Sequence, residues 1–160
     1  MASKDVFKGA KEAYTLFDAY ITTVAQDIGM ERAVALLTKT YVNIGAMGGK
    51  KVKEQAGAKK FDAKTAWPLV VRPAADAVGV SIKVVEQSPQ RVVDRVGRCS
   101  VYEAAQALGM DAKTIETMCH ASIERLVDAF VKQLDPGLSF RVRKFRSTAD
   151  DFCEEEIVLG

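Results

Sequence analysis

The chain has no long apolar segment and almost no net charge. Its longest apolar run, around Trp67–Val71, is interrupted by Pro68 and is far shorter than the ~20 residues of a membrane-spanning helix. Lysine and arginine number 23 against 21 aspartate and glutamate residues, a net charge of +2. So small a charge gives no electrostatic basis for binding nucleic acid or a membrane surface. The first residues lack the apolar core of a secretory signal, which predicts a cytoplasmic protein.

Histidine and the common catalytic motifs are equally scarce. His120 is the only histidine, and the sequence contains no Gly-x-Ser-x-Gly, Cys-x-x-Cys or His-Glu-x-x-His motif. The glycine-rich segment 45–51 lacks the spacing of a phosphate-binding loop and follows a predicted helix instead of a strand. Three cysteines are an odd number, so in a cytoplasmic chain we expect reduced thiols. No cofactor is predicted.

What remains is the composition of one globular domain. The 160 residues are 48% apolar and 28% charged, which is enough to bury a core without disulfides. We therefore expect a single domain over residues 1–160, with a helical half, 1–79, and a sheet- and cysteine-bearing half, 80–160. In the first half, apolar residues recur every three or four positions, which predicts helices over 6–28, from 31 onward and over 62–78.

Three glycines, Gly45, Gly48 and Gly49, interrupt the second predicted helix. Each interior glycine costs about 1 kcal/mol relative to alanine, so the helix must bend there or let another element pack close. Aromatic and aliphatic residues are also dense in the first two helices. Together these features predict a homodimer that packs through the helical half.

The second half changes from helical to strand periodicity. Ser100 and Glu103 form the pattern of a capping box that opens a helix ending at Gly109, and Asp111 begins a longer helix that ends at Leu134. Apolar residues that alternate with polar ones predict strands over 80–84, 91–98, 138–146 and 152–159. The predicted fold class is α+β, with a helical N-terminal half followed by an antiparallel sheet in β-β-α-α-β-β order.

The three cysteines are the most informative feature of the second half. Cys99 precedes a predicted helix, Cys119 lies on the apolar face of the long helix, and Cys153 opens the last strand. The positive end of a helix dipole should lower the pKa of the Cys99 thiol below the ~8.5 of a free thiol and so favour reactivity. Buried structural thiols, a catalytic thiol and a metal or ligand site all remain open from this pattern.

The single histidine lies between two acidic residues of the predicted long helix. Glu116 and Glu124 flank His120 at i−4 and i+4, so all three share one helix face. The triplet can be a carboxylate–imidazole acid/base unit, a pair of metal ligands, or a solvated face with favourable ion pairs.

Three segments of the second half resemble a known family. The segments 99–109 (CSVYEAAQALG), 115–119 (IETMC) and 150–157 (DDFCEEEI) are similar to the L-2-amino-thiazoline-4-carboxylic acid hydrolase family, and 28–33 (IGMERA) matches it more loosely. The same order of elements is similar to 4-vinyl-reductase-like and haem-NO-binding-associated domains, which hold small molecules. The resemblance implies a hydrolase that opens a cyclic amidine-like ring, at a C–N or C–S bond, with water and with help from a thiol.

The resemblance also implies roles for particular residues. Catalysis would use Cys99 as nucleophile or polarising thiol and either Glu155 or His120 as general acid/base. Arg98 would hold a substrate carboxylate through a bidentate contact. Tyr102, Cys119 and Cys153 would line the substrate site. The alternatives are a non-catalytic module that binds a small ligand or a metal under the three thiols, and a structural partner protein.

Glu155 departs from the family pattern, which tends to place an aromatic residue two positions after the cysteine of the last strand. Period two puts Glu155 on the same face as Cys153 and Ile157, whereas Glu154 and Glu156 lie on the opposite face, which suits solvent. A carboxylate on an inner face must be paired, protonated or beside a cavity. Glu155 therefore marks a remodelled site or a wet face, and the substrate of this chain can differ from that of the family.

Overall fold

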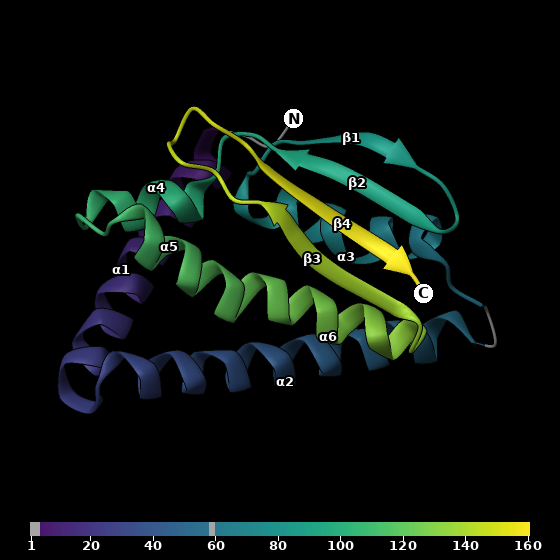
Figure 1. Cartoon of the computed structure of the whole chain (residues 1–160), viewed down its shortest axis with the longest axis horizontal. Helices are drawn as coiled ribbons and strands as arrows, with labels where there is room; N and C mark the ends of the chain where they lie inside the picture. The colour runs from purple at the N-terminus through teal and green to yellow at the C-terminus, as the bar shows by residue number, and fades with distance from the viewer. Residues whose placement is uncertain (1–3, 58–59) are drawn as a thin grey trace.

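The computed structural model describes residues 4–57 and 60–160, and its element order matches the predicted one. Three helices come first, then two strands, a helical region and two further strands (Figure 1). No helix in the described part of the chain is long and apolar enough to cross a membrane. The elements are α1 (Lys4–Ile28), α2 (Met30–Ala56), α3 (Ala63–Val78), β1 (Ile82–Gln87), β2 (Arg91–Val96), α4 (Ser100–Ala107), α5 (Ala112–Cys119), η1 (His120–Glu124), α6 (Arg125–Leu134), β3 (Leu138–Lys144) and β4 (Cys153–Leu159).

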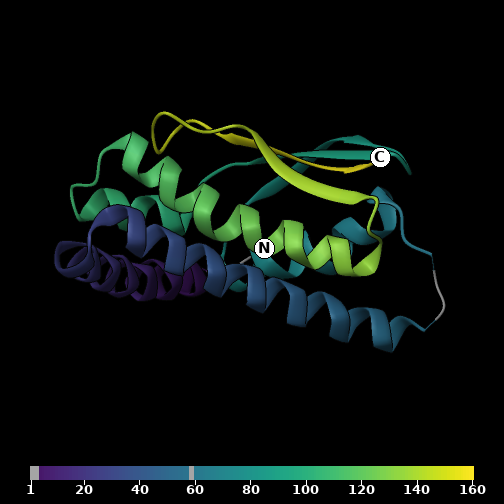
Figure 2. The ribbon, with the colours of Figure 1, turned by 60° about the horizontal axis from the view of Figure 1, so that its bottom comes forward.

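The four strands form one antiparallel sheet in the order β1-β2-β4-β3. Helices cover only one face of this sheet, and the two layers are visible from the side in Figure 2. The main core fills the space between the sheet, α3 and α6, where residues such as Trp67, Val131 and Ile157 are buried. The predicted α+β class is thus confirmed.

Helices α2 and α6 lie side by side along the length of the helical layer (Figures 1 and 2). A β-carbon added to Gly45 would collide with the backbone of Leu126, and one added to Gly49 would collide with the backbone of Phe130. The predicted close approach is therefore confirmed, but the partner is α6 of the same chain. Because α6 already covers the glycine face of α2, this face is not available to a second copy of the chain. The homodimer stays a prediction, and the glycines no longer support it.

The long predicted helix over 111–134 is not a continuous α-helix. Asp111 caps its start as predicted, but residues 120–124 form a π-helical turn between α5 and α6. In that turn the Ser122 hydroxyl donates to the backbone oxygen of Met118 at 2.6 Å. Apolar periodicity does not reveal one extra residue in a turn, and such turns often occur at functional sites.

The predicted capping box at Ser100 is wrong. Cys99 is the N-cap residue of α4 and its side chain makes no capping hydrogen bond, while Ser100 is buried inside the first turn. The Ser100 hydroxyl donates instead to the backbone oxygen of Val78, at 2.8 Å, and joins α4 to the end of α3. Glu103 ion-pairs instead with Arg98 and Lys11. The buried apolar surroundings of Ser100 favour a tertiary hydrogen bond over a local cap.

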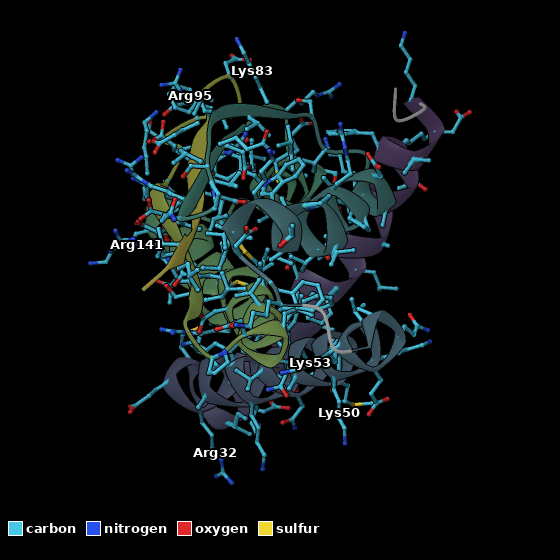
Figure 3. The ribbon with its side chains drawn as sticks, turned by 90° about the vertical axis from the view of Figure 1, so that its right-hand side faces the viewer. Arg32, Lys50, Lys53, Lys83, Arg95 and Arg141 are labelled. Carbon is cyan, nitrogen blue, oxygen red and sulfur yellow. The ribbon has the colours of Figure 1, made fainter. Side chains whose placement is uncertain are left out.

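The outer face of the sheet is charged, and Arg95 and Arg141 project from it (Figure 3). Glu156 lies on this face, as its strand parity predicts, but the expectation that it faces solvent is wrong, because its side chain is 0% exposed. Its carboxylate ion-pairs with Arg91, Arg141 and Arg143, whose side chains exclude water from it. Burial raises the pKa of Glu156, but the hydrogen bonds from Arg141 and Arg91 overcome this effect and lower it.

Candidate functional site

A cavity of about 320 Å³ lies between the sheet and the helices. Most of its wall is apolar and comes from α3, α6, η1 and the inner face of the sheet. The three cysteines, which are far apart in the sequence, all line this cavity. Its polar lining consists of Tyr14, Tyr41, Cys99, Tyr102, Cys119, Glu124, Arg146, Cys153 and Glu155.

Five of the seven residues predicted for the site line this cavity, namely Cys99, Tyr102, Cys119, Cys153 and Glu155. The other two lie elsewhere. The Arg98 side chain is 69% exposed, pairs with Glu103 and covers the Phe7 ring. The His120 side chain is 37% exposed and is not part of the cavity lining. All three cysteines are free thiols.

Cys99 lies at the start of α4 as predicted, but its pKa is raised instead of lowered. Burial is the largest cause, because it disfavours the thiolate. The backbone N–H groups of Tyr102 and Val101 and the guanidinium of Arg146 act in the lowering direction, and they do not overcome burial. The expectation of a thiolate stabilised by the helix dipole is therefore wrong for this chain.

The other two thiols differ in their surroundings. Burial raises the pKa of Cys119 well above its ordinary value, so this residue presents a neutral thiol to the cavity. The Cys153 sulfur accepts a hydrogen bond from Nε of Arg146 at 3.3 Å. The three sulfurs thus line one side of the cavity beside the buried guanidinium of Arg146.

Glu155 lies on the inner face of β4, as strand parity predicts, and it lines the cavity. Burial raises its pKa to about 8, the carboxylate of Asp94 adds to this shift, and Arg146 opposes it. At pH 7 the side chain is therefore mainly a neutral acid that can donate a proton.

Asp94 is directly opposite Glu155 in the β2–β4 ladder, and sequence reasoning missed it. It is 1% exposed, and its Oδ1 accepts a hydrogen bond from Trp67 Nε1 at 2.8 Å. Its Oδ2 has no hydrogen-bond partner among the described residues. Burial raises the pKa of Asp94 to about 6, although the bond from Trp67 acts in the opposite direction. The available signal was an aspartate at position 94, between two valines at the other positions of the same strand face, 92 and 96.

Arg146 is the second residue that sequence reasoning missed. The residue is 2% exposed and lines the cavity, and its guanidinium donates hydrogen bonds to the backbone oxygens of Val96 and Gly97. No carboxylate among the described residues forms an ion pair with it within 4 Å. Burying a cation without a counter-ion costs free energy, and binding of an anionic group to this guanidinium would offset that cost. Arg146 follows the end of β3, in a loop where no residue pattern indicates whether a side chain is buried.

The predicted Glu116–His120–Glu124 triplet exists, but it meets the cavity only through Glu124. His120 Nδ1 lies 2.8 Å from Oε2 of Glu124, and Nε2 lies 3.6 Å from Oε1 of Glu116. The same Oε2 of Glu124 accepts a hydrogen bond from the backbone N–H of Val142 at 2.9 Å. The π-helical turn thus places the Glu124 carboxylate, held by two hydrogen bonds, at the cavity wall. His120 contacts this carboxylate but does not line the cavity. Over residues 4–57 and 60–160, no three Cys, His, Asp or Glu side chains are arranged to hold a metal ion.

The solved structures that share this fold include two with a bound small molecule or fatty acid. The phenol-responsive sensory domain of the transcription activator PoxR, solved with phenol, has a TM-score of 0.65 at 10% identity, and the match covers 91% of this chain and 74% of that domain. A trafficking protein particle complex subunit 3 from Naegleria fowleri, covalently bound to palmitic acid, has a TM-score of 0.56 at 11% identity, with 94% of this chain and 96% of that subunit covered. At these identities the likeness concerns the fold alone.

The family comparison adds what the structural likeness does not. No functionally curated protein matches the chain significantly. The sequence model of the L-2-amino-thiazoline-4-carboxylic acid hydrolase family, in contrast, matches residues 9–155. That range contains every residue that lines the cavity, from Tyr14 to Glu155. The chain therefore belongs to the L-2-amino-thiazoline-4-carboxylic acid hydrolase family.

Proposed function

We propose that this chain hydrolyses a small carboxylated cyclic amidine, such as L-2-amino-thiazoline-4-carboxylic acid, inside the cavity. The observation that carries the proposal is the presence of Glu155, a neutral acid, and Arg146, an unpaired cation, in one otherwise apolar cavity. An apolar cavity with a few convergent polar groups is the usual form of a small-molecule site. The membership of the family supports the reaction class.

Arg146 is the proposed partner of the substrate carboxylate. Its Nε and Nη2 are held by Cys153, Val96 and Gly97, while Nη1 makes only a long contact of 3.5 Å with the backbone oxygen of Ala149. A carboxylate on Nη1 would supply the counter-ion that the fold does not provide. This role replaces the one that the resemblance implied for Arg98.

Glu155 and Glu124 are the proposed acid and base. Water attacks the amidine carbon, and Glu124, held by His120 and the Val142 amide, takes a proton from that water. The bond from this carbon to the ring sulfur or nitrogen breaks, and the leaving atom takes the proton of Glu155. His120 is then a positioning residue that orients Glu124, and Asp94 keeps Glu155 protonated from behind.

The three cysteines are proposed as a wall that contacts the ring, with Cys99 and Cys119 as neutral thiols. Because burial raises the pKa of Cys99 and Cys119, little thiolate is present at pH 7 to attack the substrate. Cys99→Ser should therefore lower kcat/KM less than Glu155→Gln does. A larger loss in the serine variant would restore Cys99 as the nucleophile.

The test incubates the purified chain with L-2-amino-thiazoline-4-carboxylic acid and measures substrate loss by chromatography and thiol release by a colorimetric reagent. Glu155→Gln should lower kcat/KM by about 100-fold or more, because it removes the acid and keeps the shape. Glu154→Gln, on the opposite face of β4, is the matched control and should keep its activity. Activity of the native chain should fall as the pH rises through about 8, where Glu155 loses its proton.

A second candidate is a module that binds a small ligand without turnover. The observation that favours it is the raised pKa of Cys99 and Cys119, which leaves these two thiols of the cavity protonated at pH 7. Calorimetric binding of the substrate without product formation by the native chain would favour this candidate and refute the proposed hydrolysis.

A further inference from the structure

A second, smaller chamber shares part of its wall with the main cavity. Its volume is about 20 Å³, enough for one water-sized group, and it lies among α1, α2, α4 and α5. Tyr14, Tyr41, Val101 and Cys119 line both spaces, so a ligand in the main cavity lies next to this chamber. No basic side chain of the described residues lines the chamber.

Asp18 is the acidic group of the chamber. It is 3% exposed, and none of the described residues donates a hydrogen bond to its Oδ2. Burial raises its pKa to about 6, and no neighbouring cation opposes that shift. A buried carboxylate without a donor costs several kcal/mol, which makes this side chain unfavourable for the fold on its own. It is therefore the kind of group that a positively charged hydrogen-bond donor stabilises.

Three aromatic rings accompany this carboxyl group in the chamber wall. The Tyr14 and Phe17 rings meet edge to face, with centroids 6.3 Å apart, and the Phe17 and Tyr41 rings are tilted at 6.4 Å. The negative faces of aromatic rings attract cations, and clusters of such rings are a common recognition site for ammonium groups. The tyrosine hydroxyls also supply oxygen atoms that can accept N–H bonds.

We propose that Asp18, Tyr14, Phe17 and Tyr41 form a binding site for the primary ammonium group of a ligand whose hydrocarbon part lies in the main cavity. The size of the chamber admits a primary ammonium group and excludes a quaternary one. The site lies apart from Glu155 and Arg146, and it does not depend on hydrolysis. Its ligand class is an alkyl or arylalkyl amine.

The test measures binding of hexylammonium chloride and of 1-hexanol to the full chain by isothermal titration calorimetry at pH 7.5. Hexylammonium should bind the native chain about tenfold more tightly than hexanol, because only the cation gains from Asp18 and the rings. Asp18→Asn should remove that tenfold preference and leave hexanol affinity unchanged. Phe17→Leu, which removes one ring without changing charge, should reduce the preference in the same direction.

Two controls locate the effect. Asp94→Asn replaces another buried carboxyl that also lacks a partner on Oδ2 but lies outside the chamber, so it should keep the preference. Glu155→Gln should keep it as well, and its loss there would place the amine at the proposed hydrolytic site instead. Equal binding of the two probes, or no binding of hexylammonium at millimolar concentration, would overturn the proposal. None of these outcomes depends on whether the chain hydrolyses a thiazoline.

Discussion

Glu155 and Glu156 are neighbours on β4, and both are withdrawn from bulk solvent, yet their carboxyl groups behave in opposite ways. On the outer face, three arginines surround Glu156, and the hydrogen bonds from two of them, Arg141 and Arg91, outweigh burial and lower its pKa. On the inner face, Glu155 has a carboxyl neighbour, Asp94, and a pKa of about 8. Burial alone therefore does not set the charge of an acid in this sheet. The partners that the opposite strands provide decide it.

The largest stability effect should come from breaking the outer cluster. Glu156→Gln removes the charge that three guanidinium groups surround, and we expect the free energy of unfolding at pH 7 to fall by about 3 kcal/mol. Because the pKa of Glu156 is lowered on folding, its stabilisation is present above about pH 4 and lost as the pH falls further. Urea denaturation of both chains at pH 7 and pH 3 measures this. A loss of equal size at both pH values would contradict the ionic origin.

A smaller effect of opposite sign should come from the inner face. Asp94→Asn keeps an acceptor for Trp67 and removes a buried charge, so we expect a gain of about 2 kcal/mol at pH 7.5. The folded-state pKa of Asp94 lies above the unfolded one, so its penalty is complete above about pH 6 and absent below about pH 4. The gain should accordingly vanish in denaturation curves recorded at pH 4. A variant less stable than the native chain at every pH would refute this account.

The smallest effect should come from Glu154, the half-buried outer neighbour on the same strand. Glu154 pairs with Arg95 and Arg143 at the surface, and Glu154→Gln should change the free energy of unfolding by no more than about 0.5 kcal/mol. The small change should shrink further in 0.5 M salt, which screens exposed charges. If Glu154→Gln instead lowered the free energy of unfolding as much as Glu156→Gln does, the deeper burial of Glu156 would not explain its larger contribution to stability.

The sequence predicted most of the fold because its signals are local. Apolar spacing located the helices and strands, and the Asp111 cap and the parity of 153–159 were read correctly. The predictions of a capping box at Ser100 and of an unbroken helix over 111–134 were wrong for different reasons. At Ser100 a hydrogen bond to Val78, distant in sequence, replaces the local cap. In the helix, one extra residue in the turn over 120–124 interrupts the α-helix.

The candidate site shows the same division between local and distant causes. The sequence by itself brought Cys99, Cys119, Cys153 and Glu155 into consideration, because residue type and strand face are local properties. Only the tertiary structure decided that burial would keep the Cys99 thiol neutral, that Arg146 would enter the cavity in place of Arg98, and that Asp94 would lie opposite Glu155. The protonation of a buried group depends on the water it loses and the charges it meets, and both are set by strands and helices far away in the chain.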